Sequence, residues 1–215
     1  MLLLYKFANS ASENESHDAQ RPCRWRQRNP ANLAKVHKCP SCTIPLPFLA
    51  SYKPLVLLRR EIGYVKGDAT NPQKPGNQII VHVCNDIGGC GKGFVLAISK
   101  RWKEPEAKYR EWNKSAVNFL LGEVQFVQVE PDIWIANLIG QHKVNMDENG
   151  NVPIRYEAVR TGLTKVGAFA KELDASIHMP RIGCGLAGGT WDKMEPIITE
   201  TLSDNNIPVR VYDFT

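Results

Sequence analysis

The chain has 215 residues, of which 43% are hydrophobic, so it is long enough for one domain with a well-formed core. No apolar run approaches the ~20 residues of a membrane-spanning helix, and residues 1–6 are too few for the apolar core of a signal peptide. We therefore expect a cytoplasmic protein that makes no contact with a membrane. We also expect a monomer that carries no cofactor.

The net charge of +5 is concentrated at the start of the chain. Residues 1–60 hold 10 Lys/Arg and 3 Asp/Glu, a net charge of +7, whereas residues 61–215 hold 17 and 19, a net charge of −2. Because the first segment lacks sustained periodicity and is interrupted by prolines, we predict a basic irregular arm there. The arm has two interpretations, which are a solvated tail and an electrostatic contact with nucleic acid or another polyanion.

Within the arm, Cys39 and Cys42 form a CxxC pair, and His37 and Cys23 lie upstream. Four ligands of these types are what a structural zinc site requires, so the set is a zinc candidate. Its spacing matches no standard zinc knuckle, and the alternative is free thiols in the arm. The cysteines of this chain do not form the pattern of a disulfide framework.

Regular elements are predicted from residue 61 onward. Apolar runs predict strands at 62–66, 78–84, 124–129, 133–139, 175–180 and 209–214. Helices are predicted at 93–102, 105–114, 156–173 and 191–203. We expect Pro196 to confine the regular part of the last helix to residues from Glu195 onward.

This order of elements predicts the fold class. The helix at 156–173 carries an apolar stripe typical of a helix that faces the core, formed by Tyr156, Val159, Leu163, Val166, Ala170 and Leu173. Strands and helices alternate, with one hairpin at 124–139. The pattern indicates an α/β domain with three α/β/α layers, in which helices cover both faces of a mixed central sheet.

Half of the 16 glycines lie in two short clusters, at 88–93 and 183–189. Each cluster follows a predicted strand and precedes a predicted helix. Glycine allows the backbone to approach an anion closely, and the N–H groups at the start of a helix point toward it. Two such loops in one small domain favour a ligand that contains a diphosphate.

Three segments carry a resemblance to a known family: 64–70 (YVKGDAT), 80–93, and 179–186 (MPRIGCGL). Together they resemble macro domains, and in particular the branch that contains terminal ADP-ribose protein glycohydrolase and the macro domain of a chromatin-remodelling helicase. The resemblance covers residues 61–215 and does not extend to residues 1–60. It implies a macro domain that binds ADP-ribose or a derivative.

The resemblance also implies where each part of the ligand binds. Asp68, next to Ala69, matches the aspartate that accepts a hydrogen bond from the adenine amino group, although a turn-forming aspartate is the alternative. Phe214 or Tyr212 would flank the adenine, and the alternative for either residue is a place in the core. The first loop would lie near the distal ribose, and the second would hold the diphosphate. The implied ligand-binding residues of the two loops are Asn85, Gly89, Gly91, Gly93, Gly183, Cys184, Gly185, Leu186, Ala187 and Gly188.

The catalytic residues of the related glycohydrolase are not matched. Its lysine nucleophile corresponds to Gln141 and its acid/base aspartate to Ala187, and neither side chain can perform that chemistry. His82, Asp86 and His142 are the remaining catalytic candidates, of which His82 resembles a histidine of ADP-ribose-1''-phosphate phosphatases. The alternatives are a hydrogen-bonded core histidine, a turn-forming aspartate and an exposed loop histidine.

Three hypotheses about function follow. The first is a hydrolase that removes ADP-ribose from a modified macromolecule or phosphate from ADP-ribose-1''-phosphate. The second is a non-catalytic module that binds ADP-ribose. The third is a nucleic-acid-associated protein that is targeted by its basic arm.

Overall fold

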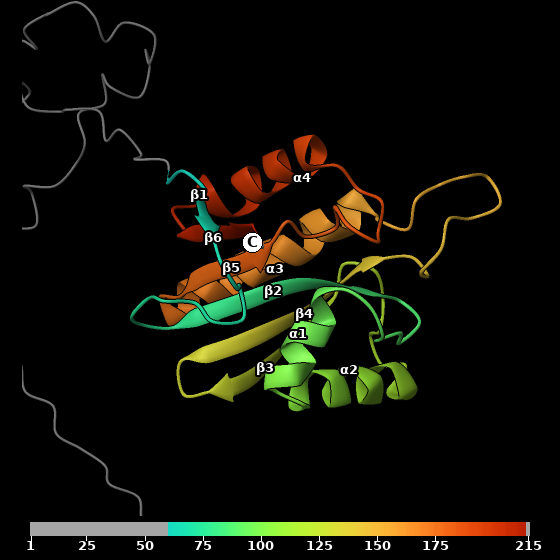
Figure 1. The fold of residues 1–215 in the computed structure, drawn as a ribbon, viewed down its shortest axis with the longest axis horizontal. Coiled ribbons are helices and arrows are strands. Elements are labelled where there is room, and N and C mark those ends of the chain that lie inside the picture. The colour runs from blue at the N-terminus through green and yellow to red at the C-terminus, as the bar shows by residue number, and fades with distance from the viewer. Residues whose placement is uncertain (1–59, 214–215) are drawn as a thin grey trace, which may run out of the picture. The chain divides into compact units, whose positions relative to one another are not determined.

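The structure is a computed structural model that describes residues 60–213 (Figure 1). The predictions for the arm lie outside the described residues, and so does Phe214. The same holds for the zinc candidates, which are Cys23, His37, Cys39 and Cys42.

The described residues form alternating strands and helices close to the predicted bounds. The strands are β1 (Gly63–Lys66), β2 (Gln78–Asn85), β3 (Val124–Glu130), β4 (Ile133–Gln141), β5 (Ser176–Pro180) and β6 (Val209–Asp213). The helices are α1 (Phe94–Arg101), α2 (Glu104–Ser115), α3 (Tyr156–Leu173), α4 (Trp191–Ile198) and the π-helix η1 (Thr199–Ser203).

The strands form one sheet in the order β1-β6-β5-β2-β4-β3. All neighbouring strands are parallel except β3 and β4, which form the predicted antiparallel hairpin. The mixed sheet expected from the sequence is therefore confirmed. Because the other strands run in one direction, their carboxyl ends meet at one edge, where open α/β sheets bind ligands.

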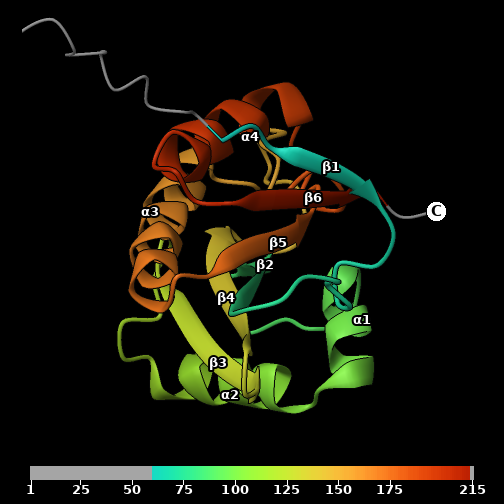
Figure 2. The same cartoon turned by 90° about the vertical axis from the view of Figure 1, so that its left-hand side faces the viewer.

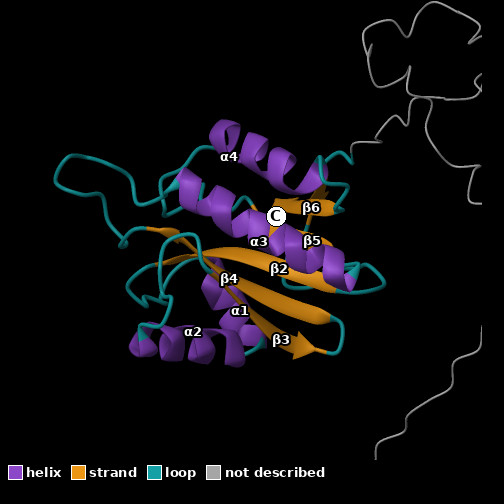
Figure 3. Ribbon diagram, turned by 180° about the vertical axis from the view of Figure 1, so that it is seen from behind, coloured by secondary structure: helices purple, strands orange, loops and turns teal. Residues whose placement is uncertain are grey.

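Helices cover both faces of the sheet, as Figure 2 shows with α3 and α4 on one side and α1 on the other. The larger core lies under α3, where the predicted stripe buries Val159, Leu163, Val166 and Ala170. Ile98 and Trp102 form a second core with strand residues on the opposite face. The view from behind in Figure 3 shows α3 crossing the strands. The three predicted layers are therefore present.

The last helix differs from the prediction. It is α-helical from Trp191 through Pro196 to Ile198 and then widens into the π-helix η1. The regular part thus precedes and includes Pro196 instead of starting at Glu195. The widened register brings the Asp204 N–H to the Thr199 carbonyl at 2.8 Å. No helix described between residues 60 and 213 is long and apolar enough to cross a membrane.

Candidate ligand-binding and active site

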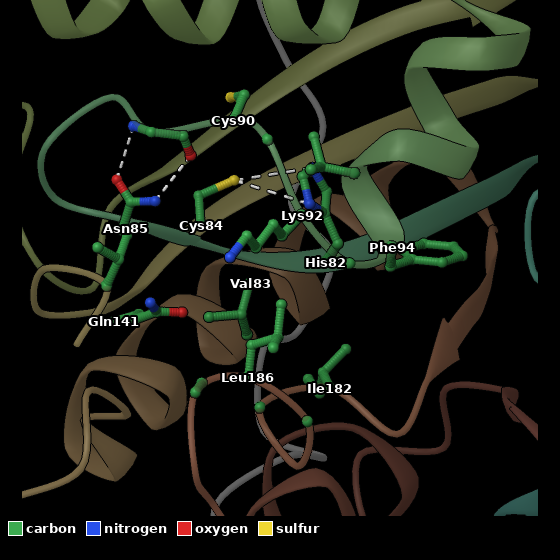
Figure 4. A pocket seen from close by; sticks show the side chains of 18 of the residues that line it. His82, Val83, Cys84, Asn85, Cys90, Lys92, Phe94, Gln141, Ile182 and Leu186 are labelled. Atoms are coloured by element: carbon green, nitrogen blue, oxygen red, sulfur yellow. Dashed lines mark hydrogen bonds between the residues drawn. The ribbon is translucent and has the colours of Figure 1, made fainter. Parts of the chain in front are cut away.

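A cavity of about 780 Å³ lies at the carboxyl ends of β2, β4 and β5 (Figure 4). Its size falls in the usual range for small-molecule sites. The residues that line it come from both glycine-rich loops and the ends of these strands: 82–85, 89–95, Gln141, Val144, Asn145, 180–183 and 185–187. The two loops are about ninety residues apart in the sequence, and the sheet brings them to one site.

The two loops approach each other across the cavity. A Cβ atom built on Gly93 would lie 3.6 Å from Cδ1 of Leu186. The N–H groups of Gly91, Lys92 and Gly93 make no hydrogen bond within residues 60–213, and neither do those of Gly185, Leu186 and Ala187. Runs of unpaired N–H groups on both sides of a cavity are a site for an anion.

The glycines of the loops serve different purposes. Gly183 has a φ of +71° and packs tightly, because an added Cβ would lie 2.7 Å from the Met194 Cε atom. Gly91 and Gly185 have no atom within 4 Å of such a Cβ. Since both line the cavity, their missing side chains leave space for a ligand to approach the backbone.

Asn85 builds the first loop. Its Oδ1 accepts the Gly89 N–H at 2.8 Å and the Ile87 N–H at 3.2 Å, and its Nδ2 donates to the Gly89 carbonyl at 2.7 Å. The Tyr109 hydroxyl donates to the Asn85 carbonyl, and burial raises the pKa of Tyr109. Asn85 therefore lines the cavity but uses its amide mainly to hold the loop in shape.

His82 lies in β2, is buried, and lines the cavity. The Nδ2 of Asn137 donates to the Pro105 carbonyl at 3.0 Å and to Oε1 of Gln125 at 3.1 Å. The Oδ1 of Asn137 is therefore the acceptor for Nε2 of His82, 2.6 Å away. This arrangement places the proton on Nε2 and leaves Nδ1 of His82 as an acceptor.

Burial lowers the pKa of His82 to about 4, although the hydrogen bond that His82 donates to Asn137 acts in the opposite direction. The ring is therefore neutral at pH 7 and cannot hold a phosphate by charge. The Cys84 thiol lies 3.8 Å from Nδ1 and 3.7 Å from Nε2, and Phe94 contacts the ring edge-on. What remains for His82 is the role of a neutral base or of a structural group.

Asp86 and His142, two of the catalytic candidates, form a pair. The Oδ2 of Asp86 lies 2.6 Å from Nδ1 of His142, and its Oδ1 accepts the Lys143 N–H at 2.8 Å. The side chains are 17% and 39% exposed, respectively. Neither residue lines the cavity, although Gln141, next to His142, does. The pair fastens the loop after β4 to the end of β2.

The other predicted ligand-binding residues divide into two groups. Within the cavity lining are Gly89, Gly91, Gly93, Gly183, Gly185, Leu186 and Ala187. Outside it are Asp68, Ala69, Cys184 and Gly188. Asp68 follows β1 at the same edge of the sheet, and its Oδ1 accepts the N–H and the hydroxyl of Thr70, each at 2.8 Å. Its adenine-binding role stays a prediction.

The thiols near the cavity are weakly acidic. Burial raises the pKa of Cys90 to about 11, and burial also raises the pKa values of Cys84 and Cys184. A thiol with a raised pKa is a poor nucleophile at neutral pH. Among the described residues, no group of histidine, cysteine, aspartate or glutamate side chains is arranged to hold a metal ion.

Two cationic residues of the cavity were not predicted from the sequence. Lys92 lies between Gly91 and Gly93 and is exposed. Arg181 follows β5 and forms a bidentate ion pair with Asp213 at 2.6 and 3.0 Å. A basic residue inside a glycine-rich phosphate loop is a signal that sequence reasoning could have used for Lys92.

The fold and the cavity together define an α/β domain with an anion-compatible cavity at the carboxyl edge of its sheet. No protein-family model matches the chain. A macrodomain protein from Streptomyces coelicolor is 56% identical, with a TM-score of 0.64 over 71% of this chain and 99% of that one. A protein of unknown function from Bacteroides thetaiotaomicron is 58% identical, with a TM-score of 0.71 over 72% of this chain and 98% of that one.

Curated relatives are similar to about the same share of this chain as these solved structures. The mouse Chromodomain-helicase-DNA-binding protein 1-like is 32% identical over 71% of this chain, which spans only 18% of the relative. The ADP-ribose 1''-phosphate phosphatase of Candida albicans is 25% identical over 70% of this chain and 98% of its own length. The ADP-ribose glycohydrolase OARD1 of Bos taurus is 27% identical over 70% and 90%. The chain belongs to the macro domain family, an ADP-ribose-binding family.

Proposed function

We propose that the cavity binds ADP-ribose and that the protein hydrolyses an ADP-ribose derivative at the end of the cavity formed by the first loop. The observation that carries the binding proposal is the pair of unpaired N–H runs, at 91–93 and 185–187, on two sides of one cavity. A diphosphate is the group whose size and charge fit two such runs. The charged side chains that line the cavity are both cations, which favours the same ligand.

The order of the strands gives the ligand a direction. Asp68 follows β1, and Arg181 follows β5, so the adenine lies toward this side in our proposal. The distal ribose then lies toward the ends of β2 and β4, where His82, Asn85 and Gln141 are found. At a 1''-phosphate, the water oxygen bonds to phosphorus as the bond from phosphorus to the ribose oxygen breaks. At a macromolecular linkage, the water oxygen bonds to C1'' of the terminal ribose as the bond to the macromolecule breaks. In both cases the leaving group takes up the proton that the water loses.

Two groups are candidates for the proton transfer. His82 offers the unprotonated Nδ1 of a neutral ring. The Asp86–His142 pair offers an imidazole oriented by a carboxylate, an arrangement suited to acid/base chemistry, at the end of β4. The known activities of the two curated hydrolases support hydrolysis as a class, and the chemistry of this chain must use residues other than Gln141 and Ala187.

Replacing Asp86 by asparagine tests the pair. The amide retains an acceptor for the Lys143 N–H and loses the charge that orients His142. If the pair moves the proton, turnover falls by roughly 100-fold or more while ADP-ribose affinity is retained. Titration calorimetry measures the affinity, and release of product from the derivative measures turnover. Unchanged turnover would remove the pair from the mechanism and leave His82.

A non-catalytic ADP-ribose-binding module is the second candidate. No aspartate or glutamate is among the described residues that line the cavity. Incubation of the protein with ADP-ribose-1''-phosphate, ADP-ribosylated protein and ADP-ribosylated DNA separates the two functions. Turnover of any substrate supports hydrolysis, whereas binding without turnover on all three supports the module. Absence of ADP-ribose binding at millimolar ligand, in a folded sample, would refute both.

Asp68 tests the proposed position of the adenine. An asparagine there keeps an acceptor for the Thr70 N–H, so the turn after β1 should persist. Loss of a charge-assisted bond to the adenine amino group should weaken ADP-ribose binding by about 1–2 kcal/mol, roughly 5- to 30-fold. Calorimetry against ADP-ribose and against ribose 5-phosphate provides the comparison, since only the first ligand carries the base. An unchanged affinity for ADP-ribose places the adenine elsewhere.

A further inference from the structure

Within the described part of the chain, one of the two cationic side chains that line the cavity is paired with a carboxylate and the other is not. The charged side chains of the lining are Lys92 and Arg181, with no carboxylate among the described residues there. The guanidinium of Arg181 is neutralised by Asp213 and lies over the rings of Trp191 and Tyr64, at 4.8 and 5.3 Å. Lys92 makes no ion pair and no hydrogen bond within residues 60–213. The uncompensated positive charge of the cavity therefore belongs to Lys92.

The two cations lie on different sides of the site. Arg181 directly follows β5, whereas Figure 4 shows the Lys92 side chain pointing into the cavity, away from Phe94 and toward the side of Asn85 and Gln141. Asn85 and Gln141 end β2 and β4, which are paired with each other. The ammonium group thus reaches toward the end of the cavity that lies beyond the proposed diphosphate position.

In the proposed function the two runs of backbone N–H groups hold the diphosphate, so Lys92 is available for another anionic group. A free ammonium at the distal end suits a second anionic group on the same ligand. We propose that Lys92 is a specificity-determining residue that selects ligands with a phosphate monoester on the terminal ribose over ligands whose terminal ribose is uncharged. This inference rests on the proposed function and names the substrate class of that site.

The flanking glycines explain how the lysine can reach its target. Gly91 has no atom within 4 Å of an added Cβ, and Gly93 has a φ of +81°. Gly93 is also the N-cap of α1, which has no side-chain cap and no acidic residue in its first turn. Lys92 therefore lies at the positive end of α1, where a phosphate is favoured and a carboxylate would compete with it.

The experiment compares the binding of two ligands to the parent chain and to its variants. Titration calorimetry measures the affinity of the full chain and of Lys92→Met for ADP-ribose and for ADP-ribose-1''-phosphate. The parent should bind the phosphorylated ligand more tightly, and Lys92→Met should reduce that preference by about 10-fold. Lys92→Arg should retain most of the preference because it keeps the charge, and Lys108→Met, an exposed lysine of α2 outside the cavity, should leave it unchanged.

The outcomes distinguish a failure of the inference about Lys92 from a failure of the proposed function. Equal weakening of both ligands in Lys92→Met would mean that the lysine contacts the diphosphate, and no weakening would mean that it contacts neither group. Both results overturn the inference while the proposed function stands. If the folded parent bound neither ligand, the proposed function itself would fail. A preference that disappears in Lys92→Met and returns in Lys92→Arg supports the inference.

Discussion

Gly185→Val should weaken ADP-ribose binding by roughly 100-fold and leave the fold intact. Gly185 lies in the second loop, lines the cavity, and has no atom within 4 Å of an added Cβ. The valine side chain therefore meets no protein atom at its Cβ and occupies space that the proposed ligand needs in order to reach the N–H groups of 185–187. Loss of two charge-assisted hydrogen bonds is worth about 3 kcal/mol, or roughly 100-fold in affinity.

Gly63→Val is the matched control. Gly63 begins β1 away from the cavity, and an added Cβ would make ordinary contacts with the Val209 carbonyl oxygen at 3.5 Å and the Arg210 Cγ at 3.7 Å. It should bind ADP-ribose like the parent. Titration calorimetry gives both affinities, and thermal unfolding shows that both variants are folded. Parental affinity in Gly185→Val would contradict the placement of the ligand at the second loop.

Much of the fold follows from local pattern. The apolar stripe of α3 and the continuous apolar run of β2 are strong local signals in the sequence. The bounds of both elements were therefore predicted within a residue or two. The shared edge of the parallel strands then brings the two glycine loops together. Pro196 is the exception, because its effect on α4 depends on how the following turn repacks as a π-helix.

The site was less predictable because side-chain partners lie far apart in the sequence. The sequence indicates Asp86 and His142 only as separate candidates, yet they pair at 2.6 Å across 56 residues. The tautomer of His82 depends on Asn137 and, through it, on Gln125 and Pro105. The spacing of residues along the chain does not reveal such contacts. Glycine-rich loops can be recognised from the sequence, because glycine permits backbone conformations that other residues rarely adopt.

Two sets of hydrogen bonds link this site to the helix α2. Asn137 donates to the Pro105 carbonyl in α2 and orients His82, and Tyr109 of the same helix holds Asn85 at the first loop. The helix α2 therefore fixes both the histidine and the loop that form one end of the cavity. A site supported by a rigid element in this way keeps its geometry before the ligand arrives, which reduces the entropic cost of binding.

Unfolding free energy should fall steeply as the pH drops from 7 to 5. Burial lowers the pKa values of both His82 and His178 from 6.5 to about 4. Between these values the unfolded chain binds a proton at each histidine and the folded chain does not. Stability from these groups is therefore complete above pH 6.5 and is lost as the pH approaches 4. Each histidine accounts for about 2 kcal/mol between pH 7 and pH 5.

Urea unfolding at the two pH values measures this loss, and substitutions assign it. His82→Gln and His178→Gln each remove one titrating group, so each should have a smaller difference in unfolding free energy between pH 7 and pH 5 than the parent. His178 is held by Ser176 and Tyr212 through hydrogen bonds of 2.9 Å, so its variant is also less stable at both pH values. Each variant is therefore judged only by its difference in unfolding free energy between pH 7 and pH 5. The control Lys108→Met should have the same difference as the parent. Protonation of a histidine in the unfolded chain, while the same histidine stays neutral and buried in the folded chain, lowers the unfolding free energy. If the difference in unfolding free energy between pH 7 and pH 5 were unchanged in both histidine variants, groups other than these histidines would cause the loss.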